Sequence, residues 1–387
     1  MTVLLFYLAL ASFVLWLGIG RELVHGDRAL ESLKDIIPSR LFLRTKISII
    51  IPARNEEKNI RKALQSMLQQ DYDNLEFILI NDRSTDNTGT ILAEMGKADL
   101  RLHVYAITEL PPGWLGKNHA LQFGAEKATG EILLFTDADV VMQPDTISRA
   151  VSYLCYRQID HLCIMPAIRI SGRLMGIFIM TFGIFFSLYA MPWRAANPHS
   201  SKHIGIGGFN MIRATVYRAI GMHQPIALRP DDDMKLGKLV KKNGYRQRML
   251  HGESHLAVEW YGSMRELING LMKNAFAGVE YSIIAIVVTT ILQFMFILWP
   301  FIALLVTDGW TLLFNLATVL IMLMLCAYTL QAQRLSPWYC IGFPLGTLLF
   351  IYILWRAMIL NIRNDGINWR GTHYSLAELK AKQGLKR

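Results

Sequence analysis

The sequence has little charge and few cysteines for its length. Asp, Glu, Lys and Arg make up 18% of its 387 residues, whereas a typical soluble protein has about 25%. Hydrophobic residues make up 52%, so the chain is neither disordered nor collagen-like. The four cysteines form no CxxC pair and have no histidine partners at zinc spacing, so we expect neither a disulfide framework nor a metal cluster.

The apolar residues are concentrated near the ends of the chain. Residues 1–20 have no internal charge and are long enough to cross a bilayer as a helix. They lack a basic amino-terminal stretch and a convincing cleavage site, so we interpret them as a transmembrane anchor and not as a signal peptide. Basic residues follow the anchor and indicate that the next part of the chain is cytosolic: Arg21, Arg28, Lys34, Arg40, Arg44 and Lys46.

Three more apolar stretches predict a carboxyl-terminal transmembrane region at 283–360. The last of them, at 338–360, is interrupted by glycine and proline, and a basic tail follows at 361–387. A fifth apolar stretch, at 176–193, lies within the otherwise mixed region 47–275. Its length alone permits a membrane span.

Within 47–275 the sequence alternates between strand and helix patterns. Apolar runs rich in β-branched residues predict strands at 47–52, 75–82, 102–107 and 131–140. Helical periodicity predicts helices that begin at Asn55–Glu57 and extend to Leu68, and that cover 90–95 and 118–127. This order is typical of an α/β fold with a mostly parallel sheet, in which ligands bind beyond the carboxyl ends of the strands.

Two aspartates end the predicted strand at 131–140. Alternate residues of a strand share a face, so Asp137 and Asp139 can converge on one point. Paired carboxylates suit Mg²⁺ or Mn²⁺, usually with substrate phosphates completing the coordination shell. The alternative is a pair of solvated carboxylates, and an isolated Asp-x-Asp does not decide between the two.

Other acids occupy comparable positions. Asp82 ends the second strand, where it can accept hydrogen bonds from a ribose or a base or form a turn together with Asp86. Asp231, Asp232 and Asp233 precede a predicted helix with the sequence MKLGKLVKKNG. One carboxylate is enough to cap that helix, so three indicate a general base held near a substrate.

Two glycine-containing loops complete the polar motifs. Gly207 and Gly208 either let the backbone approach a ligand or form a simple turn. Lys117, in the loop PPGWLGKN, either meets a phosphate as a point charge or is a surface lysine. The basic residues are not arranged with aromatic platforms, so we expect no nucleic-acid partner.

Together these motifs resemble the family 2 glycosyltransferases. The resemblance covers roughly residues 47–240, and its specificity lies in the order of short segments that are weak alone: SIIIPARNEE, LINDRSTDNT, GWLGKNHAL, LLFTDADV, GIGGFNMIR and RPDDDMKLG. The loop PPGWLGKNHAL and the segment INWRGTHY at 367–374 narrow the likeness to membrane-bound enzymes that act on lipids. These are the ceramide glucosyltransferases and the hopanoid-associated and carotenoid glycosyltransferases.

The resemblance implies a GT-A fold, a nucleotide-sugar donor such as a UDP-hexose, and an Mg²⁺ or Mn²⁺ cofactor. It places Asp82 at the uracil or ribose, with Ala53 and Glu56 lining the base pocket. It also implies that Asp137 lies by the ribose or pyrophosphate and that Asp139 binds the metal.

The same resemblance implies an inverting transfer. Asp233, the second acid of the family's acid-acid-x-x-Leu pattern, would be the base that deprotonates the acceptor hydroxyl, with Asp232 beside it. The metal and Lys117 would stabilise the departing diphosphate. Gly207 and Gly208 would contact the acceptor or the diphosphate.

One family motif is missing. Processive synthases and ceramide glucosyltransferases carry (Q/R)xxRW after the base, whereas RELINGLMKN at 265–274 has no Arg-Trp pair. Lys273 is a candidate to supply the charge. The missing pair weakens the alternative of a polysaccharide synthase.

The shared chemistry also constrains the topology. Asp139 and Asp233 belong to one site, so a single span at 176–193 would put them on opposite sides of a membrane. We therefore expect this segment to be either an interfacial element or a buried helix. Three true spans after a cytosolic domain would place the basic tail outside, against the positive-inside rule. We favour a cytosolic tail, which would let Trp369 and Arg370 approach the site.

The motifs and the apolar regions together predict an integral membrane enzyme of the bacterial inner membrane with a cytosolic catalytic domain. Its expected partners are a nucleotide-sugar donor, a membrane lipid acceptor and the bilayer. A non-catalytic nucleotide-sugar-binding membrane protein is a further alternative. A transporter would need functional polar groups within its spans, and here the acids gather outside them.

Overall fold

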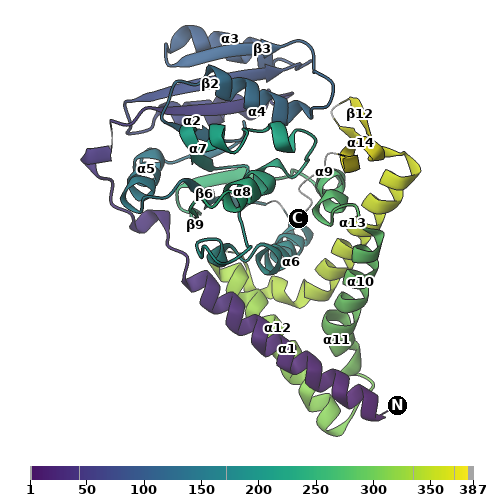
Figure 1. Ribbon diagram of the computed structural model, residues 1–387. Helices are drawn as coiled ribbons and strands as arrows, with labels where there is room; N and C mark the ends of the chain where they lie inside the picture. The colour runs from purple at the N-terminus through teal and green to yellow at the C-terminus, as the bar shows by residue number, and fades with distance from the viewer. Residues whose placement is uncertain (1, 43, 171, 334, 370, 382–387) are drawn as a thin grey trace. The chain divides into compact units, whose positions relative to one another are not determined.

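The computed structural model describes residues 2–42, 44–170, 172–333, 335–369 and 371–381 (Figure 1). The chain divides into two compact units. Unit 1 comprises Met1–Ala29, Ile170–Met191 and Trp260–Lys380, and unit 2 comprises Leu30–Arg169, Pro192–Glu259 and Ala381–Arg387.

A seven-stranded sheet forms the centre of unit 2, with the strand order β3-β2-β1-β4-β8-β6-β9. The strands are β1 Ile47–Ala53, β2 Leu75–Asp82, β3 Leu102–Ile107, β4 Ile132–Phe135, β6 His161–Met165, β8 Asn210–Arg213 and β9 Gln247–His251. The first four strands are mutually parallel, whereas β8 runs antiparallel to both of its neighbours. This mostly parallel sheet confirms the predicted α/β class.

Helices cover both faces of the sheet (Figure 1). They are α2 Ile60–Leu68, α3 Thr88–Ala98, α4 Gly116–Lys127, α5 Thr146–Tyr156, α7 Ala214–Ala219 and α8 Asp232–Lys242. Ile49 and Ile51 of β1 pack with α2, α3 and α5, and Ile50 packs with α4, α7 and α8. Because successive strand residues point to opposite faces, the continuous apolar sequence of β1 contributes side chains to the hydrophobic cores on both faces of the sheet.

Two predicted boundaries are wrong by five residues each. Helix α2 begins at Ile60 and not at Asn55, because Asn55 adopts a left-handed φ of 57° and its N–H donates to Ser84 Oγ. Strand β4 ends at Phe135, before the predicted end of the run 131–140. A second sheet with the order β5-β10-β7 follows, made of β5 Val141–Met142, β7 Ala167–Arg169 and β10 Leu256–Glu259.

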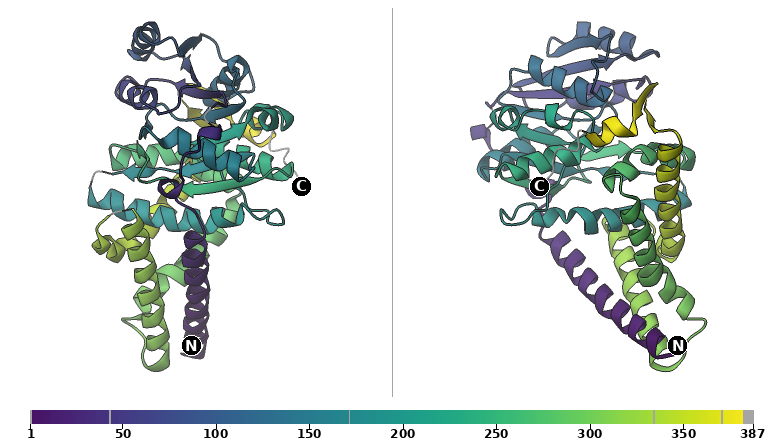
Figure 2. Two further views of the ribbon diagram at one scale, coloured as in Figure 1. Left: turned by 90° about the vertical axis from the view of Figure 1, so that its left-hand side faces the viewer. Right: turned by 45° about the vertical axis from the view of Figure 1, so that its right-hand side comes forward.

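Unit 1 is mainly helical. Its elements are α1 Thr2–Arg28, α6 Arg173–Ala190, α9 Met264–Gly278, α10 Ile283–Gln293, a π-helical turn Phe294–Leu298, α11 Trp299–Ala303, α12 Gly309–Ala332, α13 Phe343–Arg363, β11 Gly366–Trp369, β12 Thr372–Ser375 and α14 Leu376–Ala381. Helix α1 packs along α12, as both views of Figure 2 show, and α13 packs against α6 and α9. The Trp16 indole donates to the carbonyl of Phe296 at 2.7 Å, which ties α1 to the π-helical turn.

Five helices in the described part of the chain are long and apolar enough to cross a membrane. They are Thr2–Arg28, Arg173–Arg194, Ile283–Ala303, Gly309–Gln331 and Pro337–Arg363. All five coincide with the predicted apolar stretches. The glycine and proline of the last stretch lie at its start, where Pro344 occupies the first turn of α13 and a proline is tolerated.

Candidate active site

The predicted acids meet beyond the carboxyl ends of the parallel strands. Asp137 follows β4, and the hydroxyl of Thr136 donates to the carbonyl of Gly208 at 2.8 Å, which draws the chain out of the sheet after Phe135. Asp232 and Asp233 form the first turn of α8. The helix therefore begins two residues earlier than predicted, which a pair of acids at its positive end favours.

Lys117 lies among these acids and is not the free surface lysine of the alternative interpretation. Its Nζ is 2.8 Å from Asp137 Oδ1 and 3.8 Å from Asp232 Oδ1. Burial alone would lower the pKa of Lys117, but the nearby carboxylates, that of Asp137 first, outweigh burial and raise it. The lysine stays charged and compensates part of the negative charge of the cluster.

Asp233 is held by backbone donors. Its Oδ2 accepts from the N–H of Gly207 at 2.9 Å, and its Oδ1 accepts from the N–H of Met234 at 2.7 Å. Burial raises the pKa of Asp233 in spite of Lys117. Burial likewise raises the pKa of Asp232, which is 5% exposed, to about 7. Both acids are therefore shifted towards a pKa at which proton transfer near neutral pH is efficient.

A small pocket opens between these side chains. It is lined by Lys117, Leu121, Phe135, Thr136, Asp137, Gly207, Asn210, His223, Asp232, Asp233 and Leu236. In this pocket the side chain of Asp137, at 39% exposed, is more accessible than that of Asp232, at 7%.

The predicted glycine loop packs directly against α8. A Cβ on Gly207 would lie 2.9 Å from Asp137 Oδ2 and 3.5 Å from Lys117 Nζ. A Cβ on Gly205 would lie 1.8 Å from the carbonyl oxygen of Asp233. The absence of side chains at these two positions lets the loop approach the acid cluster and present the Gly207 N–H to it.

Asp139 has unused binding capacity. Its Oδ1 is buried and has no hydrogen-bond partner among the described residues. Burial, followed by the charges of Asp137 and Glu56, raises the pKa of Asp139 to about 7. No group of three or more His, Cys, Asp or Glu side chains in the described part of the chain is placed to hold a metal. The unpartnered oxygen beside other carboxylates nevertheless fits a divalent cation, because a cation would replace the missing hydrogen bond.

Asp82 lies nearby but is engaged by arginines. Arg83, whose φ is 55°, donates from Nε to Asp82 Oδ1 at 2.7 Å and from Nη2 to Oδ2 at 3.2 Å. Arg54 Nη1 is 3.9 Å from Oδ2. A Cβ on Gly116 would lie 2.5 Å from the same oxygen. Ala53, at the end of β1, is buried.

The sequence interpretation missed Asn118, whose side chain holds the segment that leads into the acids of α8. Buried Asn118 donates through Nδ2 to the carbonyls of Ile226, Ala227 and Arg229 at 2.9, 3.2 and 2.9 Å. These carbonyls directly precede the acids of α8. By holding this backbone segment, Asn118 positions the acids. The only signal was the place of Asn118 beside Lys117 in the loop motif.

The remaining predicted contacts belong to unit 1. Lys273 lies in α9, but its side chain is outside the described residues. Trp369 ends β11, and Arg370 is outside the described residues. Their predicted approach to the site stays a prediction.

Known proteins match the same part of the chain. Residues 48–221 match the family described as glycosyl transferase family 2. A 4,4'-diaponeurosporenoate glycosyltransferase of Staphylococcus haemolyticus is 40% identical over 114 residues, which are 29% of this chain and 29% of that protein. A probable glycosyltransferase of Bacillus subtilis, YdaM, is 41% identical over 97 residues, which are 24% of this chain and 23% of that protein.

One solved structure supports the fold over a longer span. The mannosyltransferase PcManGT from Pyrobaculum calidifontis, in complex with GDP-Man and Mn²⁺, aligns with a TM-score of 0.56 at 21% identity. The alignment covers 93% of this chain and 99% of that chain. The fold of this chain is therefore GT-A-like.

Proposed function

Because residues 48–221 form a family 2 glycosyltransferase domain, we propose that this protein transfers a sugar from a nucleotide sugar to a hydroxyl of a membrane lipid. The donor we propose is a UDP-hexose. The observation that carries the proposal is the convergence of Lys117 with the carboxylates of Asp137, Asp232 and Asp233 in one pocket. Such a group can take a proton from an acceptor and balance the charge of a diphosphate.

Asp233 is the proposed base. Its carboxylate removes the proton of the acceptor hydroxyl while that oxygen attacks the anomeric carbon of the sugar. The bond between this carbon and the diphosphate oxygen breaks, the electron pair leaves with the diphosphate, and the configuration inverts. The Gly207 N–H fixes the carboxylate of Asp233, and Asp232 helps to hold the ammonium of Lys117, whose charge stabilises the departing diphosphate.

The donor and the metal would bind to the acids that do not serve as the base. Asp139 would hold Mg²⁺ or Mn²⁺, which supplies charge neutralisation to the diphosphate when bound, and Asp137 would lie by the ribose or pyrophosphate. Asp82, with Glu56 and Ala53, would line the nucleoside part. Arg83 already orients the Asp82 carboxylate, so we expect the nucleoside to meet this pair and not an isolated acid.

Three observations support a lipid acceptor and a membrane location. Five helices in the described part of the chain are long and apolar enough to span a bilayer, and the Staphylococcus haemolyticus relative is named for 4,4'-diaponeurosporenoate. Both ends of α6 lead into unit 2, so both ends of this helix should lie on the same side of the membrane. We propose that this side is the cytosol of a bacterial cell.

Turnover by the full chain in phospholipid nanodiscs tests the proposal. Wild type, Asp233→Asn and the exposed control Asp73→Asn are each given a panel of radiolabelled nucleotide sugars, extracted membrane lipids and Mn²⁺. We expect a labelled lipid with wild type and Asp73→Asn, and a loss of about 10²- to 10⁴-fold with Asp233→Asn. Full activity in Asp233→Asn would remove this residue as the base.

The same panel separates the alternative functions. A ladder of long products would indicate a polysaccharide synthase. Binding of a nucleotide sugar without turnover on any acceptor would indicate a non-catalytic binding protein.

A further inference from the structure

A segment that we call the strap, residues 33–42, follows the anchor helix closely and belongs to unit 2. It consists of two short 3-10 turns, Leu33–Asp35 and Arg40–Phe42, with residues 36–39 between them. Leu33 is fully buried in the main core, and Ile36 and Phe42 pack against that core. These inward side chains make the strap part of the folded unit and not a free linker.

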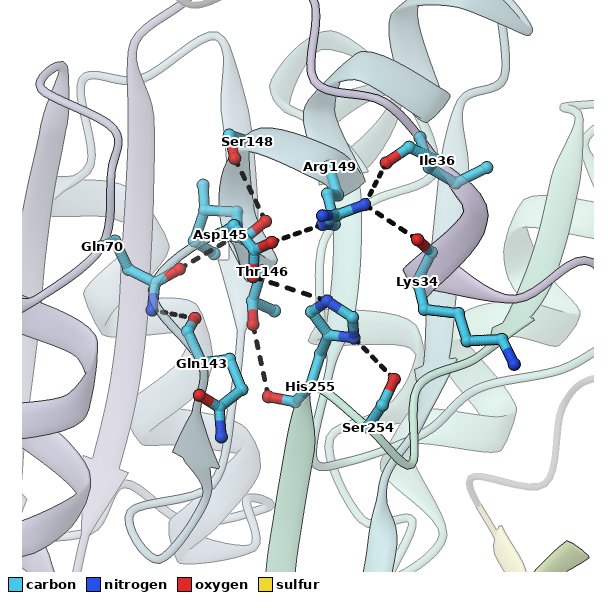
Figure 3. A network of polar contacts seen from close by, with 11 residues as sticks. Lys34, Ile36, Gln70, Gln143, Asp145, Thr146, Ser148, Arg149, Ser254 and His255 are labelled. Carbon is cyan, nitrogen blue, oxygen red and sulfur yellow. Dashed lines mark hydrogen bonds and ion pairs between the residues drawn. The ribbon is translucent and has the colours of Figure 1, made fainter.

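Polar contacts fix the backbone of the strap. Figure 3 shows the guanidinium of Arg149 donating to the carbonyls of Lys34, at 3.0 Å, and of Ile36. Arg149 is held in turn by Asp145 at 2.6 Å, which also lies 3.4 Å from His255 Nε2. A charged donor that bridges two main-chain carbonyls leaves this part of the strap little freedom to move.

The far end of the strap is fixed in the same way. The N–H of Ser39 donates to Ser152 Oγ at 2.8 Å, and the hydroxyl of Tyr72 donates to the carbonyl of Phe42 at 3.0 Å. The strap is thus pinned along its length by α5 and its neighbours.

Two large apolar side chains of this rigid segment nevertheless point into solvent. Ile37 is 85% exposed and Leu41 is 84% exposed. Tyr156 is 76% exposed and shares a face of α5 with Arg149 and Ser152, because these residues are spaced three and four apart. It therefore extends the apolar surface from the strap onto α5.

We propose that the strap docks unit 2 onto the headgroup region of a phospholipid bilayer, with Ile37 and Leu41 entering the boundary of the acyl chains. This inference rests on the proposed membrane location, because the chain itself brings the strap to the bilayer. Ile37 is only nine residues beyond Arg28, where α1 ends, so the connecting chain spans at most about 30 Å.

The charges around the strap suit the same partner. Lys34 and Arg44 are exposed, and their side chains can reach lipid phosphates while the apolar tips insert. Asp35 is also exposed, so these three described side chains together carry only a small excess of positive charge. We therefore expect insertion of Ile37 and Leu41, and not charge, to contribute most of the contact.

Depth measurements on the full chain in phosphatidylcholine/phosphatidylglycerol nanodiscs test this proposal. In a background with Cys155→Ser and Cys340→Ser, nitroxide labels are attached to Ile37→Cys, Leu41→Cys and the control Leu100→Cys. Leu100 is also exposed, at 94%, in unit 2, but it precedes β3 and lies outside the strap. Collision with oxygen, which concentrates in acyl chains, is compared with collision with a water-soluble nickel chelate.

We expect labels at 37 and 41 to collide with oxygen and to lose access to nickel, while the label at 100 keeps it. Nickel access at 37 and 41 equal to that at 100 would overturn the proposal. Loss of access to both reagents would also overturn it, because it indicates that protein, such as a second copy, covers the strap. Co-elution of the chain with nanodiscs separately reports whether the anchor enters the membrane, so failure of the membrane location is distinguishable from failure of the docking.

Discussion

Two polar clusters that contain buried carboxylates occupy opposite ends of the parallel strands of unit 2. At the amino end, Glu76 of β2 accepts from the hydroxyl of Ser48 on β1 and from the N–H of Thr129. Burial alone would raise the pKa of Glu76, but these hydrogen bonds and Lys46 lower it to about 2. At the carboxyl end, burial raises the pKa of Asp139 to about 7.

The contrast distinguishes a carboxylate that stabilises the fold from carboxylates available to a ligand. Glu76 receives donors on both oxygens, so it has little capacity left for an external partner. Asp139 keeps a buried oxygen without a hydrogen-bond partner among the described residues, and Asp232 has a raised pKa beside a pocket. Perturbed acids that lie in a pocket are typical of functional sites.

Among the variants that compare the two clusters, we expect the largest effect from a change of Lys117, the lysine of the carboxyl-end cluster. Lys117→Gln removes the cation that is 2.8 Å from Asp137 and leaves neighbouring carboxylates uncompensated. We expect transfer to fall by about 10²- to 10³-fold, the usual effect of losing one stabilising group in the transition state. Initial rates at saturating donor in nanodiscs measure it. An activity close to that of wild type would remove Lys117 from the reaction.

The next effect tests the amino-end cluster. The change in the pKa of Glu76 from its ordinary value of 4.5 to about 2 corresponds to about 3 kcal/mol of stability. Because the pKa is lowered on folding, this contribution is complete above pH 4.5 and disappears as the pH falls towards 2.

We therefore expect Glu76→Gln to lower the melting temperature at pH 7 by roughly 10 °C while the rate per folded molecule is unchanged. The two melting temperatures should converge in acid. Loss of turnover without loss of stability would contradict the structural role of Glu76.

A smaller effect concerns cation binding. Asp139 with a pKa of about 7 carries a proton at pH 6 that a metal must displace. We expect the apparent affinity for Mn²⁺ in the presence of UDP to rise about fivefold from pH 6 to 7 and to level off above pH 8. Electron paramagnetic resonance of free Mn²⁺ measures the binding. Asp139→Asn serves as the control and should abolish the pH dependence of Mn²⁺ binding. An affinity of wild type that does not change with pH would contradict the role of Asp139 in binding the cation.

The smallest effect comes from the lysine of the amino-end cluster. Lys46 Nζ is 2.9 Å from Glu76 Oε2, but its side chain is 40% exposed, so water screens the pair. We expect Lys46→Gln to cost about 0.5 kcal/mol, measured as a small shift in melting temperature, with unchanged transfer. As the matched partner of Lys117→Gln, this variant should show that the position of a lysine, and not its charge alone, decides the effect on catalysis.

The sequence predicted the four parallel strands β1 to β4, because they lie in apolar runs, but it did not predict β6, β8 and β9. It also singled out Asp137, Asp139 and the acids of α8 as candidate site residues, since acids at strand and helix ends stand out. It predicted the start of α2 wrongly, because the left-handed Asn55 is held by Ser84, a residue distant in sequence.

Other features of the site depend on contacts between distant segments. The residues around Lys117 allow either a contact with a phosphate or a place at the surface, and only the fold brings this lysine to Asp232. The exposed side chains of the strap are equally unpredictable, because Ile36 and Ile37 have the same chemistry. Backbone contacts alone decide that one packs inward and the other points outward.

The insertion of α6 between the two main segments of unit 2 imposes an order on biosynthesis. Asp139 leaves the ribosome before α6, and Asp233 leaves after it. Strands β8 and β9, which complete the central sheet, are also made after α6. Helix α6 is therefore synthesised while the central sheet is incomplete and still has an unpaired edge. Shortening the protein at both ends would not isolate the catalytic unit unless a short polar linker also replaced α6.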